Sequence, residues 1–338
     1  MPFSLRAALF ALLPSSHLRY LRHLRILPPD GRTGRYIAGQ AGRRTLVGMA
    51  GQTLAEIRTL LNAAGLSPRH RFGQNFLIDL NLMRKIVAAA QLGAGDVVLE
   101  VGPGTGSLTE LLLDTGCRVV AVEIDRDLHR LLAARLGDHP RLTQLCGDAL
   151  AGKHALHPAL LDALHAQRPA PEGAYKLVAN LPYQIATPLI MELLYGRPRF
   201  ASLTCTIQKE VAERVLSPPG RSSYGPVSVV AQTLAEVRRV ASLPPEVFWP
   251  QPKVASLAIQ LALRDDAPVP EPQWPEFVRL VRTAFMQRRK MLRSALKPLG
   301  IRALSDKLAA CGISPDARAE MVSPQLWQSL QRALSARR

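Results

Sequence analysis

The chain has 338 residues, of which 47% are hydrophobic, so it is long enough for two domains or for one large α/β domain with an appendage. Its formal net charge of +17 favours a polyanionic partner, although arginine enrichment in a GC-rich genome would give the same total. No run approaches eighteen consecutive apolar residues, which excludes a membrane-spanning helix. The four cysteines are scattered and form no C-x-x-C pair, which argues against a disulfide framework or a zinc site and predicts a cytoplasmic protein.

Residues 1–48 contain eight arginines and a single acid, Asp30. This composition is typical of an organelle transit peptide, but a disordered basic arm would share it, and so would upstream sequence that is translated only on paper. The stretch "MAGQTLAEIRTLLNAAGL" begins cleanly at Met49 as an amphipathic helix. We therefore favour a disordered arm or a misassigned start, and exclude 1–48 from the predicted fold.

Short apolar strands alternate with helices from Gly95 onward. The pattern predicts strands over 96–102, 118–125, 141–149, 175–183 and 202–208, and helices over 107–116, 127–137, 187–196 and 209–216. The alternating stretch "KVASLAIQLAL" predicts a late strand over 253–263. Repeated βα units of this length predict a mostly parallel sheet that is covered by helices on both faces.

One connection in this series is long and rich in His, Ala and Pro, from Ala151 to Ala174. Its histidines, His154, His157 and His165, have no nearby set of Cys or carboxylate residues that would complete a metal site. We interpret the segment as a surface insertion and expect no metal in the protein.

The stretch "DDAPVPEPQ" from Asp265 has the composition of a linker. Beyond it the sequence reads as helical over 274–285, 288–300, 304–312 and 323–336. The sequence therefore predicts a main α/β domain over 49–264 and a small all-helical domain over 265–338.

The stretch "EVGPGTG", Glu100 to Gly106, ends the first predicted strand and opens a helix. Glycines there allow close approach of the backbone to a ligand, and a helix N-terminus offers free N–H groups. Glu123 ends the second strand, where a carboxylate can accept both hydroxyls of a ribose. Dinucleotide enzymes and S-adenosylmethionine (SAM) enzymes share these features, and the G-x-G-x-G spacing favours SAM modestly.

Asp148 follows the third strand at the edge of the sheet where α/β proteins bind ligands. Its carboxylate can accept a hydrogen bond from the exocyclic amine of a ligand. Taken alone, it is equally well explained as the N-cap of a helix.

The fourth strand ends in "VANLPY", residues 178–183, where a simple turn would more often use glycine. The exocyclic nitrogen of adenine is a poor nucleophile because its lone pair is delocalised into the ring. The Asn180 side-chain oxygen and the Leu181 carbonyl could accept its two N–H bonds and localise that lone pair. Pro182 would fix the loop and Tyr183 could stack on a base held out of its helix. A strand-end turn with a core tyrosine is the alternative, which the glycine loop, Glu123 and Asp148 in order before it disfavour.

Nine stretches, in order along the chain, carry a resemblance to a known family. They are "RHRFGQNFLID", "EVGPGTGSLT", "EID", "GDAL", "NLPYQIATP", "IQKEVAERV", "SSYGPVSVVAQ", "VFWPQPKV" and "AFMQRRKMLRSAL". The chain resembles the ribosomal RNA adenine N6-dimethyltransferases from about Met49 to its end, and in particular their bacterial small-subunit (KsgA) type. The resemblance implies a Rossmann-like SAM-dependent methyltransferase fold with a mostly parallel sheet, followed by a small all-helical C-terminal domain.

The same resemblance implies roles for individual residues. The cofactor would contact Asn75, Leu77, Gly102, Glu123, Asp148 and Asn180, while Asn180, Leu181, Pro182 and Tyr183 would hold the target adenine. Phe248 looks like a second aromatic wall for the base, with a core phenylalanine as an equally good interpretation. Gln184, Ala186 and Pro226 depart from the usual residues of the family, which puts details of the substrate loops in doubt.

The stretch "QRRKMLRSALK" predicts Arg288, Arg289, Lys290, Arg293 and Lys297 within three turns of one helix. Such a cluster would position rRNA through its phosphates, unless it is only a solvated helix face. Arg69, His70 and Arg71 would add a second basic patch.

These observations favour SAM-dependent dimethylation of two adjacent adenosines near the 3′ end of small-subunit rRNA, within a 30S precursor, by a monomer. The alternatives are a large-subunit rRNA adenine methyltransferase of the macrolide-resistance type and an assembly factor that keeps the fold without catalysis. A third alternative is an NAD oxidoreductase, but "NLPY" and the basic C-terminal segment would have no function in such an enzyme. DNA adenine methyltransferases share the acceptor chemistry, but their usual loop begins with Asp.

Overall fold

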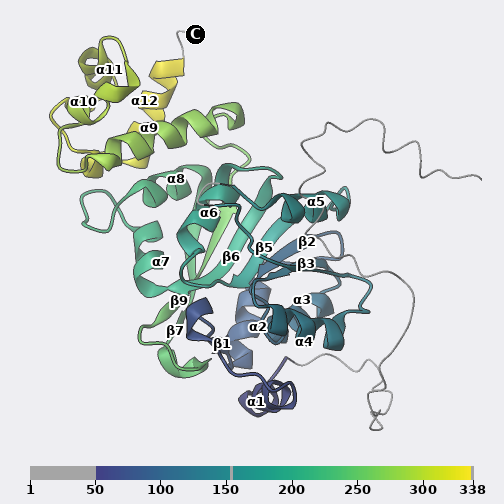
Figure 1. Cartoon of the computed structure of the whole chain (residues 1–338). Helices are drawn as coiled ribbons and strands as arrows, with labels where there is room; N and C mark the ends of the chain where they lie inside the picture. Colours follow the sequence, from purple (N-terminus) through teal and green to yellow (C-terminus); the bar gives the residue numbers. More distant parts are fainter. Residues whose placement is uncertain (1–50, 153–154, 336–338) are drawn as a thin grey trace, which may run out of the picture. The chain divides into compact units, whose positions relative to one another are not determined.

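The computed structural model describes residues 51–152 and 155–335 (Figure 1). The expectations for residues 1–48 and for His154 fall outside these ranges. Within them, no helix is both long enough and apolar enough to cross a membrane.

A seven-stranded sheet forms the centre of the fold, in the order β4-β3-β2-β5-β6-β9-β7. Its strands are β2 (Val97–Val101), β3 (Arg118–Glu123), β4 (Leu142–Cys146), β5 (Tyr175–Asn180), β6 (Phe200–Gln208), β7 (Ala235–Leu243) and β9 (Ser256–Leu263). The first five strands in this order pair in parallel, and β9 is antiparallel to both of its neighbours. The mostly parallel sheet is confirmed.

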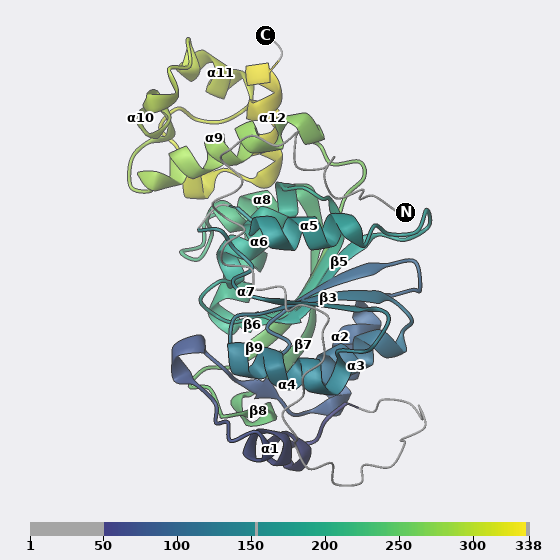
Figure 2. The same cartoon turned by 45° about the vertical axis from the view of Figure 1, so that its right-hand side comes forward.

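Helices cover both faces of this sheet (Figure 2). One face carries α2 (Leu80–Ala89), α3 (Ser107–Asp114) and α4 (Arg126–Leu136), and the other carries α5 (Pro158–Ala166), α6 (Ala186–Tyr195), α7 (Lys209–Leu216) and α8 (Pro226–Leu234). Successive residues of β2 belong to different cores: Leu99 lies in the core on the α5–α8 side, and Val98 in the core on the α2–α4 side. Because side chains alternate along a strand, a strand buried on both faces is largely apolar, and in β2 only Glu100 interrupts the apolar sequence.

The expectation that the segment from Ala151 to Ala174 is a surface insertion is wrong. The segment contains α5. Leu160 and Leu164 are fully buried against the sheet, and the imidazole of His157 caps the helix by accepting the Ala159 N–H. The segment is therefore the helix of an ordinary βαβ crossover, and two apolar positions one turn apart were its sequence signal.

Strand β7 and helix α8 were not predicted from the sequence. In β7, Glu236, Arg238 and Arg239 are exposed, which is how an edge strand avoids pairing with other chains. The charges that protect this edge also hide its apolar alternation.

A small substructure packs on the α2–α4 side of the sheet. It consists of α1 (Leu54–Ala63) and the antiparallel pair β1 (Phe76–Leu77) and β8 (Phe248–Trp249). Thr53 caps α1 together with Glu56, so the helix begins five residues after the expected Met49. Gln52 ties the segment to the start of α3, because its N–H donates to Ser107 Oγ over 2.9 Å.

The C-terminal part is helical, as expected. It comprises α9 (Trp274–Met286), α10 (Leu292–Ala295), α11 (Leu304–Ala310) and α12 (Pro324–Ser335). Short 3-10 turns complete the fold at His70–Phe72 (η2), Pro245–Val247 (η3), Glu271–Gln273 (η4), Lys297–Leu299 (η5) and Ala319–Met321 (η6). The apolar side chains of α9 and α12 share one core with α8, which includes Trp327.

The expected three-turn helix over 288–297 is wrong. Helix α9 ends at Met286, and the chain turns before α10. The N–H of Leu292 donates to the carbonyl of Ala317 over 2.7 Å, and Met291 pairs with Arg318 in an isolated bridge. These long-range backbone contacts replace the helical i→i−4 bonds that local propensity favours.

The hydroxyl of Tyr224 joins the α7–α8 connection to the helical C-terminal part. It is fully buried and donates to the carbonyl of Val322 over 2.9 Å. We expect Tyr224→Phe to lower the free energy of unfolding by about 1–2 kcal/mol, because a buried carbonyl loses its partner. Urea unfolding measures this loss. Thr59→Val, which removes an exposed hydroxyl that donates to the carbonyl of Ala55 in its own helix, is the control, and an equal loss in both variants would contradict the prediction.

Candidate active site and cofactor cavity

One cavity opens at the carboxyl ends of β2, β3, β4 and β5. The predicted site residues that line it are Asn75, Leu77, Gly102, Glu123, Asp148, Asn180, Leu181, Pro182 and Tyr183. They come from five separate stretches of sequence. The carboxyl ends of parallel strands bring all of them except Asn75 and Leu77 to one edge of the sheet, and these two belong to β1 and the residue before it. Among the described residues, no group of His, Cys, Asp and Glu side chains is arranged to hold a metal ion.

The glycine loop lies against the cavity without room for side chains. At Gly104, where φ is +59°, a Cβ atom would lie 2.9 Å from the ring of Phe76. At Gly102, where φ is +75°, a Cβ would lie 3.3 Å from Pro182. The two glycines therefore permit both the backbone conformation and the close approach of Phe76 and Pro182.

Glu123 presents a nearly buried carboxylate to the cavity, with 5% of the residue exposed. Its Oε2 accepts the Gly104 N–H over 3.1 Å and its Oε1 accepts the Asp125 N–H over 2.9 Å. Burial raises the pKa of Glu123 above its ordinary value, and the two backbone donors oppose that shift. Each oxygen keeps a lone pair for a ligand hydroxyl.

Asn180 has a fixed amide orientation. Its Nδ2 donates to the backbone carbonyl of Asn75 over 3.0 Å, so the amide nitrogen is engaged and Oδ1 is left to accept. The N–H of Leu181 donates to the carbonyl of Thr206 over 3.1 Å, which anchors the next peptide to β6.

Tyr183 is held at its hydroxyl by Ser256, with 3.0 Å between the two oxygens. Burial raises the pKa of Tyr183 above its ordinary value, while the Ser256 bond opposes the shift. Ser256 is 1% exposed and begins β9. The sequence analysis did not identify it, because a serine within an alternating strand carries no local signal.

Asp148 is exposed and lines the cavity, but its Oδ1 accepts the Leu150 N–H over 2.9 Å. The expected alternative of a helix N-cap is wrong, since no helix begins here and the carboxylate closes a turn instead. Its second oxygen can still accept a hydrogen bond from a ligand.

Phe248 is not among the residues that line this cavity, and its expected role as a second aromatic wall stays a prediction. It is 3% exposed and packs in the core on the α2–α4 side, paired with Leu77 across β1 and β8. The pairing register directs its side chain inward, as the alternative interpretation of a core phenylalanine held. The aromatic residues that do line the cavity are Phe72, Phe76 and Tyr183.

The expected rRNA-contacting cluster is partly neutralised. Arg288 Nε lies 2.6 Å from Glu320 Oε2, and Arg293 Nη2 lies 3.0 Å from Asp316 Oδ1. Arg289 and Lys290 are exposed, and within 51–152 and 155–335 their side chains make no hydrogen bond or ion pair. The charge available to a polyanion in this turn is therefore carried by Arg289 and Lys290.

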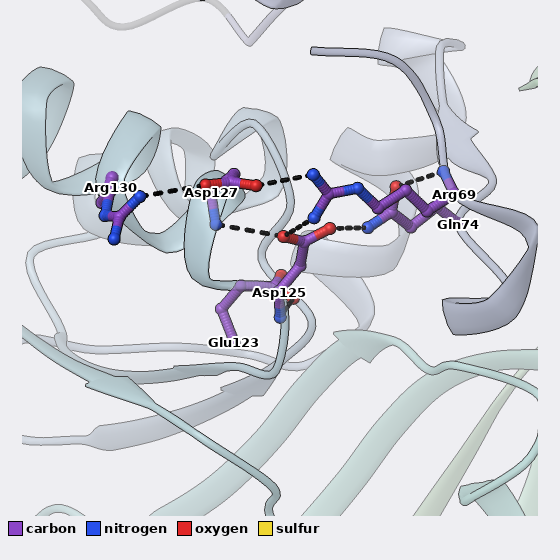
Figure 3. A network of polar contacts seen from close by, with 6 residues as sticks. All are labelled: Arg69, Gln74, Glu123, Asp125, Asp127 and Arg130. Atoms are coloured by element: carbon purple, nitrogen blue, oxygen red, sulfur yellow. Dashed lines mark hydrogen bonds and ion pairs between the residues drawn. The ribbon is translucent and has the colours of Figure 1, made fainter.

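Arg69 does not form a free basic patch with His70 and Arg71. Its guanidinium bridges Asp125 and Asp127, the two acids that flank the start of α4 (Figure 3). The bond from Arg69 lowers the pKa of Asp127 below its ordinary value. Sequence reasoning overestimated the charge of this loop because the two acids lie more than fifty residues away.

Glu100 is a second buried carboxyl of the cavity that the sequence analysis gave no role. It is 1% exposed and accepts the hydroxyl of Thr109 over 2.7 Å. Burial raises the pKa of Glu100 from 4.5 to about 8, although the Thr109 bond opposes the shift. The shift favours the protonated form of Glu100 at neutral pH.

This shift makes stability depend on pH. Between pH 4.5 and 8 the folded protein binds a proton at Glu100 that the unfolded chain has lost, so the free energy of unfolding falls as pH rises. We expect Glu100→Gln to be more stable than the parent, by an amount that grows from pH 5 to pH 8 and reaches about 4 kcal/mol. Urea unfolding at several pH values measures the difference. A difference that is independent of pH would contradict the prediction.

The residues present fit SAM. Glu123 offers two carboxylate oxygens to a ribose, and Ile57, Leu108 and Leu128 supply apolar walls. The sheet order, the glycine loop and this donor set together define a Rossmann-like SAM-dependent methyltransferase, which confirms the fold class and the cofactor.

Comparison with known proteins specifies the class further. The family model "Ribosomal RNA adenine dimethylase" matches residues 65–335. The chain belongs to the ribosomal RNA adenine dimethylase family.

Two curated relatives show how far the similarity extends. A protein of Phenylobacterium zucineum named "Ribosomal RNA small subunit methyltransferase A" is 45% identical over 290 residues, which cover 86% of this chain and 96% of that protein. The protein of that name from Moorella thermoacetica is 40% identical over 291 residues, with 85% of this chain and 98% of that protein covered.

Two solved structures share the architecture. The dimethyladenosine transferase from Plasmodium falciparum superposes with a TM-score of 0.62 at 25% identity, covering 75% of this chain and 95% of that one. The 23S rRNA methyltransferase ErmE gives a TM-score of 0.57 at 25% identity, covering 77% of this chain and 99% of that one.

Proposed function

We propose that this protein uses SAM to dimethylate the N6 amines of two adjacent adenosines near the 3′ end of small-subunit rRNA. It acts as a monomer on a 30S precursor in the cytoplasm. The observation that carries the proposal is the fixed Asn180 amide, whose nitrogen is bound to Asn75 and whose oxygen is left to accept an amine. The names of the curated relatives support the choice of small-subunit rRNA.

The chain's own residues would activate the amine by geometry. Asn180 Oδ1 and the Leu181 carbonyl would accept the two N–H bonds of the adenine amine and draw its lone pair out of conjugation. Tyr183, anchored by Ser256, would stack on the base, and Pro182 would hold the turn. SAM, when bound, supplies a methyl group on a cationic sulfur. A strong general base is not required, since the methylated amine can release its proton to water.

We assign catalysis to residues 49–264 and rRNA positioning to the helical part, 265–338. Its turn at Arg289 and Lys290 offers two exposed cations for phosphates. The hydrogen bond from Tyr224 to Val322 joins these two parts at a packed interface, so both would contact the RNA in a fixed arrangement.

A second candidate is methylation of large-subunit rRNA. It is favoured by the 77% of this chain that superposes on the 23S rRNA methyltransferase. The sequence identities of 45% and 40% to proteins named for the small subunit favour the first candidate.

The decisive experiment measures methyl transfer from labelled SAM to small ribosomal subunits that lack the modification, followed by nucleoside mass analysis. We expect dimethyladenosine at two adjacent positions. Transfer to large-subunit RNA alone would establish the second candidate. SAM binding without transfer to either subunit would indicate a non-catalytic assembly factor.

Asn180→Ala should abolish methyl transfer and weaken SAM binding measurably, because it removes the amide oxygen and frees the Asn75 carbonyl. Activity on small subunits and calorimetric binding of SAM measure the two effects. Asn62→Ala, at an exposed position on α1, is the control and should keep both. Loss of the folded state in Asn180→Ala would instead assign Asn180 a structural role.

The double variant Arg289→Ala/Lys290→Ala should weaken RNA binding, and it should reduce the slope of log K against log salt by about 2, one for each lost phosphate contact. Filter binding over a salt series measures the slope. Arg302→Ala, at another exposed arginine of the helical part, is the control. An unchanged slope in the double variant would remove this turn from the RNA interface.

A further inference from the structure

The segment 69–77, called the loop 69–77 below, contacts Asp125 and Asp127, which follow the cavity residue Glu123, and also contacts the cavity residue Asn180. Its first residue, Arg69, places Nη1 2.8 Å from Asp125 Oδ1 and Nη2 2.6 Å from Asp127 Oδ2. Farther along, the carbonyl of Asn75 accepts the Asn180 amide. The loop therefore lies between the carboxylate proposed to hold the ribose and the amide proposed to hold the adenine.

Asp125 lies between Arg69 and Glu123, as Figure 3 shows. Its side chain is 3% exposed, and its Oδ2 also accepts the Gln74 Nε2 over 2.8 Å. Its own N–H donates to Glu123 Oε1 over 2.9 Å. Because the carboxylate and the N–H belong to one residue, a displacement of the Asp125 side chain also disturbs the donor that orients Glu123.

Hydrogen bonds within the loop transmit the anchor to the adenine end. The N–H of Arg69 donates to Gln74 Oε1 over 2.8 Å, so the two residues fix each other. Asn75, the next residue, donates from Nδ2 to the carbonyl of Gly73 over 3.1 Å. The position of the Asn75 carbonyl, which orients Asn180, is set by this closed loop.

We propose that Arg69 is a positioning residue that bridges Asp125 and Asp127. Through this bridge, the loop 69–77 keeps the Glu123 carboxylate and the Asn180 amide in a fixed position relative to each other. Arg69 would act through Asp125 and Gln74 without touching cofactor or RNA. Its effect on Glu123 is independent of the RNA substrate, whereas its effect on Asn180 rests on the proposed function.

The chemistry of the bridge requires arginine. A guanidinium is planar and offers two parallel N–H groups to separate carboxylates, whereas an ammonium is a point charge. Arg130 approaches Asp127 from the other side, with 3.1 Å between Nη1 and Oδ1, and has 77% of its side chain exposed. Arg130 thus shares one acid with Arg69, but within the described residues its side chain forms no hydrogen bond or ion pair with Asp125 or with the loop, which makes it a matched control.

The test compares Arg69→Ala, Arg69→Lys and Arg130→Ala in the full chain. SAM affinity is measured by calorimetry, and kcat and KM are measured on small ribosomal subunits at saturating SAM. We expect Arg69→Ala to weaken SAM binding about tenfold and to lower kcat about tenfold, because misplaced groups lose catalytic alignment. Arg69→Lys should recover only part of both losses, and Arg130→Ala should match the parent.

A double variant tests the route of the effect. If Arg69 acts through Asp125, the combination Arg69→Ala/Asp125→Asn should bind SAM no more weakly than the poorer single variant. Additive losses would overturn the route. If Arg69→Ala does not fold, Arg69→Lys and Arg69→Gln replace it, with thermal unfolding as the check.

Two results would overturn the proposal. A raised KM for the ribosomal subunit with unchanged SAM affinity and kcat would make Arg69 an RNA contact. A lowered unfolding temperature with unchanged SAM affinity and kcat would make the bridge purely structural. Calorimetry with SAM needs no RNA, so absence of methylation by the parent protein would refute the proposed function while the Arg69 effect on binding is still measured.

Discussion

The hydrogen bond from Asn180 Nδ2 to the carbonyl of Asn75 is the contact on which the rest of the site depends. An amide can present either its oxygen or its NH₂ group, and the two choices have opposite chemistry toward an amine. The Asn75 carbonyl can only accept, so it selects the orientation that leaves the Asn180 oxygen to accept. Strand β5 brings Asn180 to the edge of the sheet, and β1 and its preceding loop bring Asn75 over it.

The cavity and the surface of this basic protein differ in the sign of their charged groups. With a net charge of +17 the chain attracts phosphates, yet the cavity holds two buried carboxyls, Glu100 and Glu123. Burial raises the pKa of both, and only Glu123 receives two backbone N–H bonds that favour its charged form. A buried carboxylate accepts the hydroxyls of a ribose and disfavours a phosphate, which suits a site for SAM rather than for the RNA backbone.

Features governed by local sequence could be predicted. The alternation of strands and helices, the glycine loop and the sites of Glu123 and Asn180 follow from apolar periodicity and from residues at strand ends. Features governed by distant partners could not. The sequence predicted Arg69 to be a free cation, but the fold places Asp125 and Asp127 next to it. The sequence also predicted a helix at Arg289, but the N–H of Leu292 donates to the carbonyl of Ala317 and the chain turns there. Phe248 could be assigned neither to the core nor to the cavity, since both environments favour an aromatic residue.

The direction of β9 has its own consequence for the site. Ser256 is the first residue of β9 and lies beside Gln208, the last residue of β6. In a parallel strand the first residue would lie at the opposite edge, far from Tyr183. Because β9 runs antiparallel to β6, its first residue lies at the edge of the sheet where the parallel strands end. The residue that anchors Tyr183 can therefore lie 73 positions away in the sequence, at the start of a strand that runs against both of its neighbours.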